Sequence, residues 1–388
     1  MAEKNNNALL WTIGIVLIVL GFVYFSATGG SGGTLKVGVL TPLTGDAASY
    51  GTAMQRAYDL AVSQINAAGG VNGKNIELVY EDSKCDGAAA TTATQKLVSV
   101  DGVKFILGGT CSGETLAAAP ITQAARVLLL SPSATSPDIT DAGDLVFRTY
   151  PSDDFEAKMV ASYAESTGQM RAAIISETTD FAQGVRNAFK ASYTGEVVFD
   201  ETFNSGETDF RTLITKLRAA NPQMVYVSPQ SPAAGELILK QIAESGMNVA
   251  VFANNAMIDR SAIAANPSLY EEVVMAEVQL PSEGKAVDML TAYEAMYGNS
   301  PEFVAYTASA YDSVYLLAEA VGSVGEDAEA VAGYFGYQVV DWPGAIGTFN
   351  FDENGDAEVE LTLVQAISGA LVPLQAQANV VPEVETTK

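Results

Sequence analysis

The sequence predicts an α/β protein with two Rossmann-like, doubly wound lobes, preceded by a transmembrane helix. Short apolar runs alternate with helical stretches from residue 34 onward, and the alternation restarts after residue 150. Strands this apolar, separated by helices, are typical of parallel sheets buried on both faces. At 388 residues, with 48% hydrophobic content, the chain is long enough for two such units and is not wholly disordered.

An uncharged apolar segment, ALLWTIGIVLIVLGFVYF, occupies residues 8–25. As a helix it would span about 27 Å, close to the hydrocarbon thickness of a bilayer. It is longer than the core of a signal peptide, and residues 26–29 are a mediocre cleavage site, so we favour an uncleaved membrane anchor over a cleaved signal peptide or a core helix. Lys4 precedes the segment and the chain after it is acidic, which places the rest outside the membrane.

Hydrophobic periodicity gives the elements of each unit. The first unit has predicted strands and helices in alternation at residues 35–40, 54–65, 76–80, 88–100, 103–107, 114–125 and 127–130. The second unit continues the pattern at residues 154–166, 171–176, 181–192, 196–202, 209–219, 223–228, 232–245, 249–253 and 272–279. Two helices and a closing pair of strands follow, at residues 284–297, 302–321, 346–350 and 358–366.

Composition excludes several classes of function. The formal net charge of −26 disfavours nucleic acid and anionic headgroups as partners. The chain has no histidine, which removes the commonest general base and metal ligand, so we expect no catalytic residues, no metal and no cofactor. Cys85 and Cys111 each follow a predicted strand at one sheet edge, which makes a disulfide plausible in an oxidising compartment; a redox or nucleophilic cysteine is the competing hypothesis.

Ligands of open parallel sheets bind beyond the carboxyl ends of strands, so the loops there are the candidate site. The loop at 41–51 ends with Tyr50, which could close over a pocket or simply lie on the surface. The loop at 108–115 places Ser112 at a helix N-terminus, where its hydroxyl and amide can donate to a carboxylate or act as an ordinary cap. The hydroxyl-rich loop at 131–137 follows the next strand, and together the two loops indicate an anion site.

Three other sequence patterns are not interpreted as functional sites. Residues 352–356 resemble part of a calcium loop, but Leu363 stands where the last ligand is needed, so we expect a hairpin turn. Residues 108–113 lack the lysine of a P-loop. The acidic pairs at 153–154 and 271–272 are interpreted as solvated faces.

In addition, the sequence resembles the type I periplasmic solute-binding proteins, and most closely the branched-chain amino-acid (Leu/Ile/Val) binding proteins of ABC importers. The resemblance runs from about residue 35 to 370 and is specific because its segments occur together and in order. These segments are residues 37–45, 65–74, 81–82, 85–86, 108–113, 131–135, 147–149, 311–312 and 351–356.

The resemblance implies two lobes joined by a three-strand hinge that close on a ligand. The implied division is an anchor and linker at 1–33, lobe 1 at 34–152 and 280–336, lobe 2 at 153–279 and 337–371, and a disordered tail at 372–388. It also implies that the family's disulfide falls at Cys85 and Cys111. The implied ligand-binding residues are Tyr50, Ser112, Ser133, Ala134, Thr135, Phe181, Gln230, Asn255 and Tyr306.

Two departures from the family pattern concern the ligand. Ala256 stands where the family has an acidic partner for the ligand's ammonium group, and Gln230 replaces an aromatic residue. A buried ammonium without a counter-charge costs several kcal/mol. Therefore Asn255, Asp259 or a shifted register compensates, or the ligand is a short amide, a urea-like compound or a carboxylate.

We expect an extracytoplasmic, monomeric solute-binding protein that captures an amino acid or related ligand and delivers it to ABC permease subunits, anchored to the membrane through residues 8–25. Hinge closure on the ligand needs no covalent step. The alternative is a ligand-sensing receptor or accessory subunit that feeds no transporter. An extracellular enzyme would need a cleft carboxylate of raised pKa, because histidine is absent.

Overall fold

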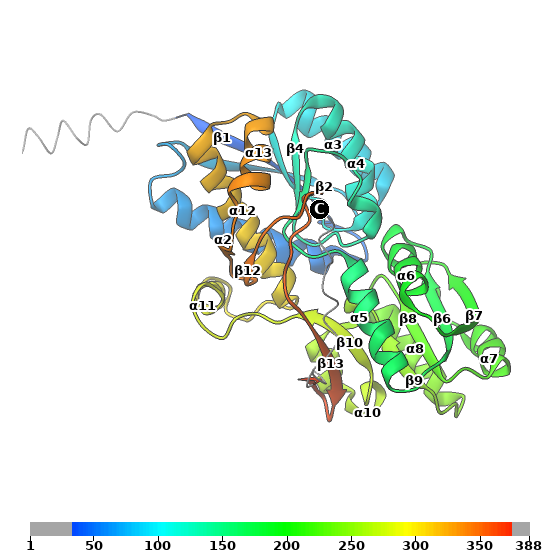
Figure 1. Cartoon of the computed structure of the whole chain (residues 1–388). Helices are drawn as coiled ribbons and strands as arrows, with labels where there is room; N and C mark the ends of the chain where they lie inside the picture. The colour runs from blue at the N-terminus through cyan, green and yellow to red at the C-terminus, as the bar shows by residue number, and fades with distance from the viewer. Residues whose placement is uncertain (1–32, 375–388) are drawn as a thin grey trace, which may run out of the picture.

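The computed structural model describes residues 33–374, which form two α/β lobes (Figure 1). Lobe 1 is built on a parallel five-stranded sheet with the strand order β2-β1-β3-β4-β5. The strands are β1 (Thr34–Thr41), β2 (Asn75–Asp82), β3 (Phe105–Gly108), β4 (Leu128–Ser131) and β5 (Val146–Arg148). The parallel sheet predicted from the apolar runs is confirmed.

Helices cover both faces of this sheet, which is why β3 and β4 are buried throughout. On β3, Phe105 and Leu107 face one hydrophobic core while Ile106 faces the other. The first core contains α2 (Ala48–Ala67), α11 (Lys285–Tyr297), α12 (Val304–Val324) and α13 (Ala328–Gln338). The second core contains α3 (Gly87–Lys96), its π-helical extension Leu97–Asp101, and α4 (Ser112–Ala125).

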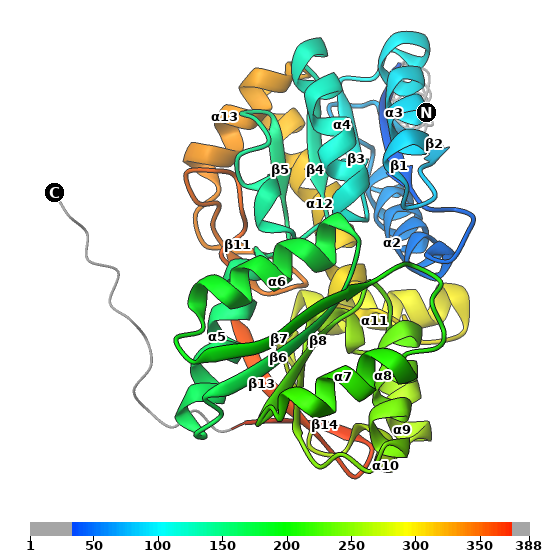
Figure 2. The same ribbon diagram turned by 90° about the vertical axis from the view of Figure 1, so that its right-hand side faces the viewer.

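Lobe 2 has a seven-stranded sheet with the order β14-β13-β10-β9-β8-β6-β7, in which β13 and β14 are the antiparallel strands. Its strands are β6 (Arg171–Glu177), β7 (Glu196–Phe203), β8 (Met224–Ser228), β9 (Ala250–Ala253), β10 (Val274–Val278), β13 (Leu361–Ile367) and β14 (Ala370–Pro373). Its helices are α5 (Asp153–Ser166), α6 (Asp180–Ser192), α7 (Arg211–Ala220), α8 (Pro232–Glu244), α9 (Arg260–Ala265) and α10 (Pro267–Tyr270). Figure 2 shows α6 at the boundary with lobe 1.

Three crossings join the lobes, at residues 149–152, 279–284 and 358–360. The first and third are tied together where they leave lobe 1, because the buried guanidinium of Arg148 pairs with Asp356, with Nη2 and Oδ2 2.6 Å apart. The main chains also pair there, since the Arg148 amide donates to Gly355 O at 3.0 Å and the Ala357 amide donates to Arg148 O at 3.1 Å. These contacts hold two of the three connecting segments side by side.

The structure differs from the predicted division of the chain after residue 337. Trp342, Ile346, Phe349 and Phe351 are buried in the core of lobe 1, so β11 (Trp342–Pro343) and β12 (Thr348–Phe349) belong to lobe 1. Aromatic packing explains this placement, because the ring of Phe351 lies 5.5 Å from that of Phe335 in α13.

The two closing strands predicted at residues 346–350 and 358–366 do not pair with each other. β12 pairs with β11, whereas β13 pairs with β10 and β14 in the other lobe. The turn between them does close on itself, since the Asp352 amide donates to Asp356 O at 2.9 Å.

No helix within residues 33–374 is long and apolar enough to cross a membrane. The predicted membrane span at 8–25 lies outside the described residues. The predicted disordered tail is wrong for its first residues, because β14 continues through Pro373. The remainder of that prediction, at residues 375–388, lies outside the described residues.

Candidate ligand-binding site

A small pocket lies in the cleft between the lobes, at the carboxyl ends of β1, β3 and β4. Lobe 1 and lobe 2 both contribute to the wall, which consists of Tyr50, Thr110, Cys111, Ser112, Ser133, Phe181, Gln230, Ala256 and Tyr306.

The N-terminus of α4 forms one end of the pocket. Glu114 Oε1 accepts the amides of Thr110 and Cys111, the latter at 2.9 Å, as in a capping box. The next amides, of Ser112 and Gly113, are first-turn donors that the helix itself leaves free. Ser112 Oγ accepts the Ser136 amide at 3.1 Å, so its own proton remains available. This end of the pocket therefore offers hydrogen-bond donors and a positive helix dipole to an anion.

Burial raises the pKa of Glu114 to about 7. The carboxyl is fully buried beneath the loop, and the amides of Cys111 and Thr110 oppose the rise in pKa because they favour the charged form. Gly109 makes this approach possible, since a Cβ there would lie 2.4 Å from Glu114 Cγ.

Hydroxyl groups at the end of β4 and in the loop after it hydrogen-bond to the loop that precedes α4. Ser131 Oγ donates to Gly109 O at 2.7 Å, and Ser133 Oγ donates to Thr110 O at 2.9 Å. Because the Ser133 hydroxyl already donates its proton to that carbonyl, its oxygen can only accept a hydrogen bond from a ligand in the pocket. An acceptor beside the anion-binding end suits a ligand that carries both a carboxylate and an amine.

Aromatic side chains form the rest of the wall. Tyr50 stacks on Phe303 with ring centroids 4.0 Å apart, and Tyr306 packs against Tyr150 at 4.7 Å. Phe181, from the start of α6, faces them from lobe 2. These rings give the pocket an apolar side.

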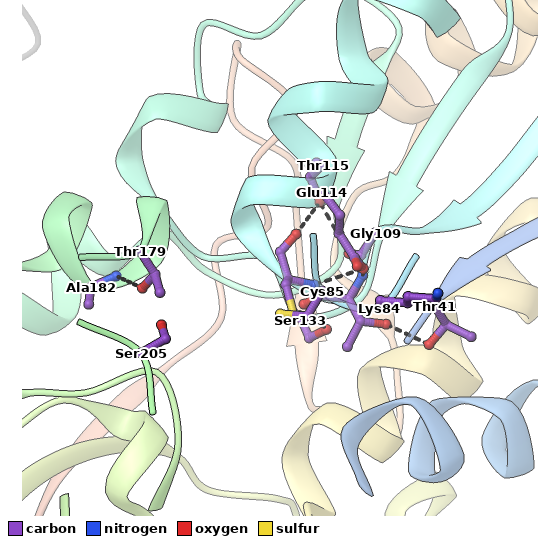
Figure 3. The surroundings of a disulfide bond; sticks show 12 residues. Thr41, Lys84, Cys85, Gly109, Glu114, Thr115, Ser133, Thr179, Ala182 and Ser205 are labelled. Atoms are coloured by element: carbon purple, nitrogen blue, oxygen red, sulfur yellow. Dashed lines mark hydrogen bonds between the residues drawn. A yellow bond between two sulfur atoms is a disulfide. The ribbon is translucent and has the colours of Figure 1, made fainter. Parts of the chain in front are cut away.

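The predicted disulfide is confirmed by the structure: Cys85 and Cys111 are bonded, with Cα atoms 5.5 Å apart. It ties the loop after β2 to the N-cap residue of α4, directly at the pocket (Figure 3). The figure also shows Thr179, the N-cap residue of α6, and Ala182 in the first turn of that helix, on the opposite lobe.

The two lobes touch across the mouth of the cleft. Ser136 Oγ donates to Asp180 O at 3.4 Å, and Tyr306 OH donates to Asn255 Oδ1 at 3.1 Å. Glycines allow the closest approach, since a Cβ on Gly184 of α6 would lie 2.4 Å from Ser136 Oγ. The structure therefore has the lobes closed on the pocket.

The structure brings together six of the nine expected ligand-binding residues: Tyr50, Ser112, Ser133, Phe181, Gln230 and Tyr306. The other three lie outside the lining. Ala134 and Thr135 are buried behind Ser133, where their carbonyl oxygens accept Arg148 Nη1 and the Asp153 amide. Asn255 lies one residue from the wall, and Asp259 caps α9 by accepting the Ser261 and Ala262 amides. The lining also includes Ala256, the position that the resemblance assigns to the family's ammonium partner, and Thr110 and Cys111, which were not expected.

The interpretation of Asp153 as a solvated acid is wrong. Asp153 and Glu156 are both 1% exposed, whereas Asp154 is exposed. A sequence signal for this existed, because both acids share the helical spacing of the buried alanines of α5, such as Ala157 and Ala164. Glu271 and Glu272 are exposed, as predicted.

Two sheet-based lobes that close on a small pocket with an anion-binding end define a hinged solute-binding protein. The chain belongs to the periplasmic binding protein family, whose model matches residues 34–370. It is 32% identical over 362 residues to the leucine-, isoleucine-, valine-, threonine-, and alanine-binding protein of Pseudomonas aeruginosa, covering 91% of this chain and 94% of that protein.

Solved structures agree with this assignment. The branched-chain amino acid transporter substrate binding protein LivJ from Streptococcus pneumoniae, in complex with isoleucine, matches with a TM-score of 0.78 and 29% identity. The match covers 88% of this chain and all of that one. A leucine complex of an ABC transporter substrate-binding protein from Desulfitobacterium hafniense matches with a TM-score of 0.71 and 25% identity, again over 88% and 100% of the chains. The family is one of solute-binding proteins, not of enzymes.

Proposed function

We propose that this chain is the extracytoplasmic solute-binding component of an ABC importer and that it captures an amino acid of the branched-chain type. The observation that carries the proposal is the pocket itself, with the amides of α4 at one end and Tyr50, Phe181 and Tyr306 around the remainder. The donors suit an α-carboxylate, and the rings suit an apolar side chain. The named ligands of the relatives support the same choice.

The Cys85–Cys111 disulfide supports a location outside the cytoplasm, because such bonds persist in oxidising compartments. We further propose that residues 8–25 anchor the chain to the membrane and that it acts as a monomer. Fractionation of cells that express the full chain tests the anchor: the protein should remain with membranes after a high-salt wash and be released by detergent.

A second candidate ligand is a carboxylate or amide without an amine. The observation that favours it is Ala256, which leaves the lining of the pocket without an acidic side chain. In this case the protein would serve as a receptor or importer subunit for such compounds.

Thermal unfolding of the purified full chain against a ligand panel distinguishes the candidates. The panel contains leucine, isoleucine, valine and alanine, their des-amino acids, and short amides. A ligand at 100 times its Kd adds about 2.7 kcal/mol to the free energy of unfolding. Stabilisation by an amino acid supports the first candidate and stabilisation only by amine-free compounds supports the second. No stabilisation across the panel contradicts both.

A further inference from the structure

Two buried acids lie at the start of α5, at the first crossing between the lobes. Asp153 and Glu156 are three residues apart and are therefore neighbours on one helix face. The N-terminal end of a helix is the end that favours carboxylates, which partly offsets the cost of burying them. Neither acid lines the pocket, and the amino-acid capture proposed above assigns them no role.

Glu156 has no cationic partner among the residues that the structure describes. Its Oε1 accepts the Asn255 amide at 2.9 Å, while its Oε2 is buried without a hydrogen bond. Its charged neighbour is Asp153, another acid, and none of the ion pairs within residues 33–374 includes it. The positive charge of Arg148 opposes the rise in the pKa of Asp153. However, the Arg148 guanidinium already donates hydrogen bonds to Asp356 and to Ser136 O, the latter at 2.8 Å.

One residue connects Glu156 to the pocket wall. The backbone amide of Asn255 donates to Glu156, and its side-chain Oδ1 accepts the hydroxyl of Tyr306 at 3.1 Å. Asn255 also directly precedes Ala256 in the chain. Tyr306 and Ala256 both line the pocket. Burial raises the pKa of Tyr306 well above its usual value, and Tyr150, Tyr50, Asp153 and Glu156 raise it further, so the Tyr306 hydroxyl keeps the proton that it donates to Asn255.

We propose that Glu156, supported by Asp153 and acting through Asn255, supplies the negative charge that selects ligands carrying an ammonium group. This inference rests on the proposed function and explains how an amino acid is held although Ala256 provides no carboxylate. The ligand's carboxylate lies at Ser112. Its ammonium group lies toward Ser133 and Tyr306, where the Ser133 oxygen accepts a hydrogen bond.

The arrangement accounts for an otherwise costly feature of the fold. A buried carboxylate with an unbonded oxygen carries a large desolvation penalty unless a charge compensates it. Burial, together with Asp153, raises the pKa of Glu156, so an arriving ammonium stabilises its charged form. Glu156 is therefore a positioning and specificity residue that acts from behind the wall.

The test is the ratio of affinities for leucine and 4-methylpentanoate, which differ only by the amine, measured by calorimetry on the full chain. The wild type is expected to prefer leucine. Glu156→Gln keeps the shape of the side chain and removes its charge, and it is expected to reduce that preference by about 10- to 100-fold. Asp154→Asn is the matched control, because it removes an exposed charge from the same helix turn and should leave the ratio unchanged.

Glu156→Asp keeps the charge at a slightly greater distance and should retain most of the preference, which covers the case that Glu156→Gln does not fold. A wild type that binds 4-methylpentanoate as well as leucine overturns this inference and leaves solute binding intact. An equal loss of both affinities in Glu156→Gln, or a complete loss of preference in Glu156→Asp, assigns a structural role and also overturns it. A wild type that binds no member of the panel overturns the proposed function itself.

Discussion

Substitution of Gly184 by alanine is expected to weaken ligand binding without weakening the fold. Gly184 lies in α6 of lobe 2, and the three atoms nearest to a Cβ there belong to lobe 1: Ser136 Oγ at 2.4 Å, Pro137 Cδ at 3.1 Å and Ser136 Cβ at 3.2 Å. Rotation of the Ser136 hydroxyl relieves the first contact but not the other two. The lobes must therefore separate by about 0.3 Å at this point, because ordinary contact begins at 3.4 Å.

The size of the effect follows from the cost of overpacking. An added carbon in a tight contact costs about 1–3 kcal/mol, which corresponds to a Kd higher by about 5- to 150-fold. The free protein avoids this cost by opening, and alanine is better than glycine inside a helix by about 0.5–1 kcal/mol. Gly184→Ala should thus bind more weakly and yet unfold at the same or a higher temperature.

Calorimetric titration and thermal unfolding of the unliganded protein measure the two effects separately. Gly333→Ala is the matched control, because Gly333 lies in α13 with no atom within 4 Å of an added Cβ. It should show the gain in stability with an unchanged Kd. A Kd for Gly184→Ala within twofold of the wild type would refute the argument, since the closed contact would then play no part in binding.

Three further predictions concern the pocket and its support. Ser112→Asp places a carboxylate at the N-terminus of α4 and should lower the affinity for any carboxylate ligand at least about 100-fold by calorimetry; an unchanged affinity would mean that the anion binds elsewhere. Replacing Cys85 and Cys111 together by serine opens a loop of sequence separation 26 and should lower the free energy of unfolding by about 3.5 kcal/mol in urea titrations, and a change below about 1 kcal/mol would contradict this. Because burial raises the pKa of Glu114 to about 7, the folded state retains a proton that the unfolded state releases, so stability should fall as pH rises from about 4.5 to 7. Glu114→Gln removes this titration and should therefore reduce the dependence of the free energy of unfolding on pH over this range. An unaltered pH dependence would contradict the role of Glu114.

Much of the fold was predictable because its determinants are local. Strands such as β3 and β4 are buried on both faces and therefore appear as unbroken apolar runs. The start of α4 at Ser112 comes a short loop after β3, so it can be located from the end of that strand. The assignment of residues 342–357 to a lobe was not predictable in this way. It depends on where Phe351 finds aromatic partners, which is a long-range property of the packed chain.

The site was predictable to the extent that it is built from strand-end loops. Ser112 and Ser133 follow neighbouring parallel strands, so their meeting at one sheet edge could be expected. Thr135 lies outside the lining because the loop after β4 turns its carbonyl to the Asp153 amide, a contact that only the tertiary structure reveals. The burial of Glu156 was missed because a charged residue at a helix start is usually solvated.

The crystal structure of the protein with leucine tests the central claim most directly. The account predicts the amino acid between the lobes, with its carboxylate within hydrogen-bonding distance of the Ser112 hydroxyl and of the first amides of α4. It also predicts the ammonium group on the side of Ser133 and Tyr306, and the side chain against the aromatic wall. Leucine bound in the reverse orientation, or outside the cleft, would contradict the account.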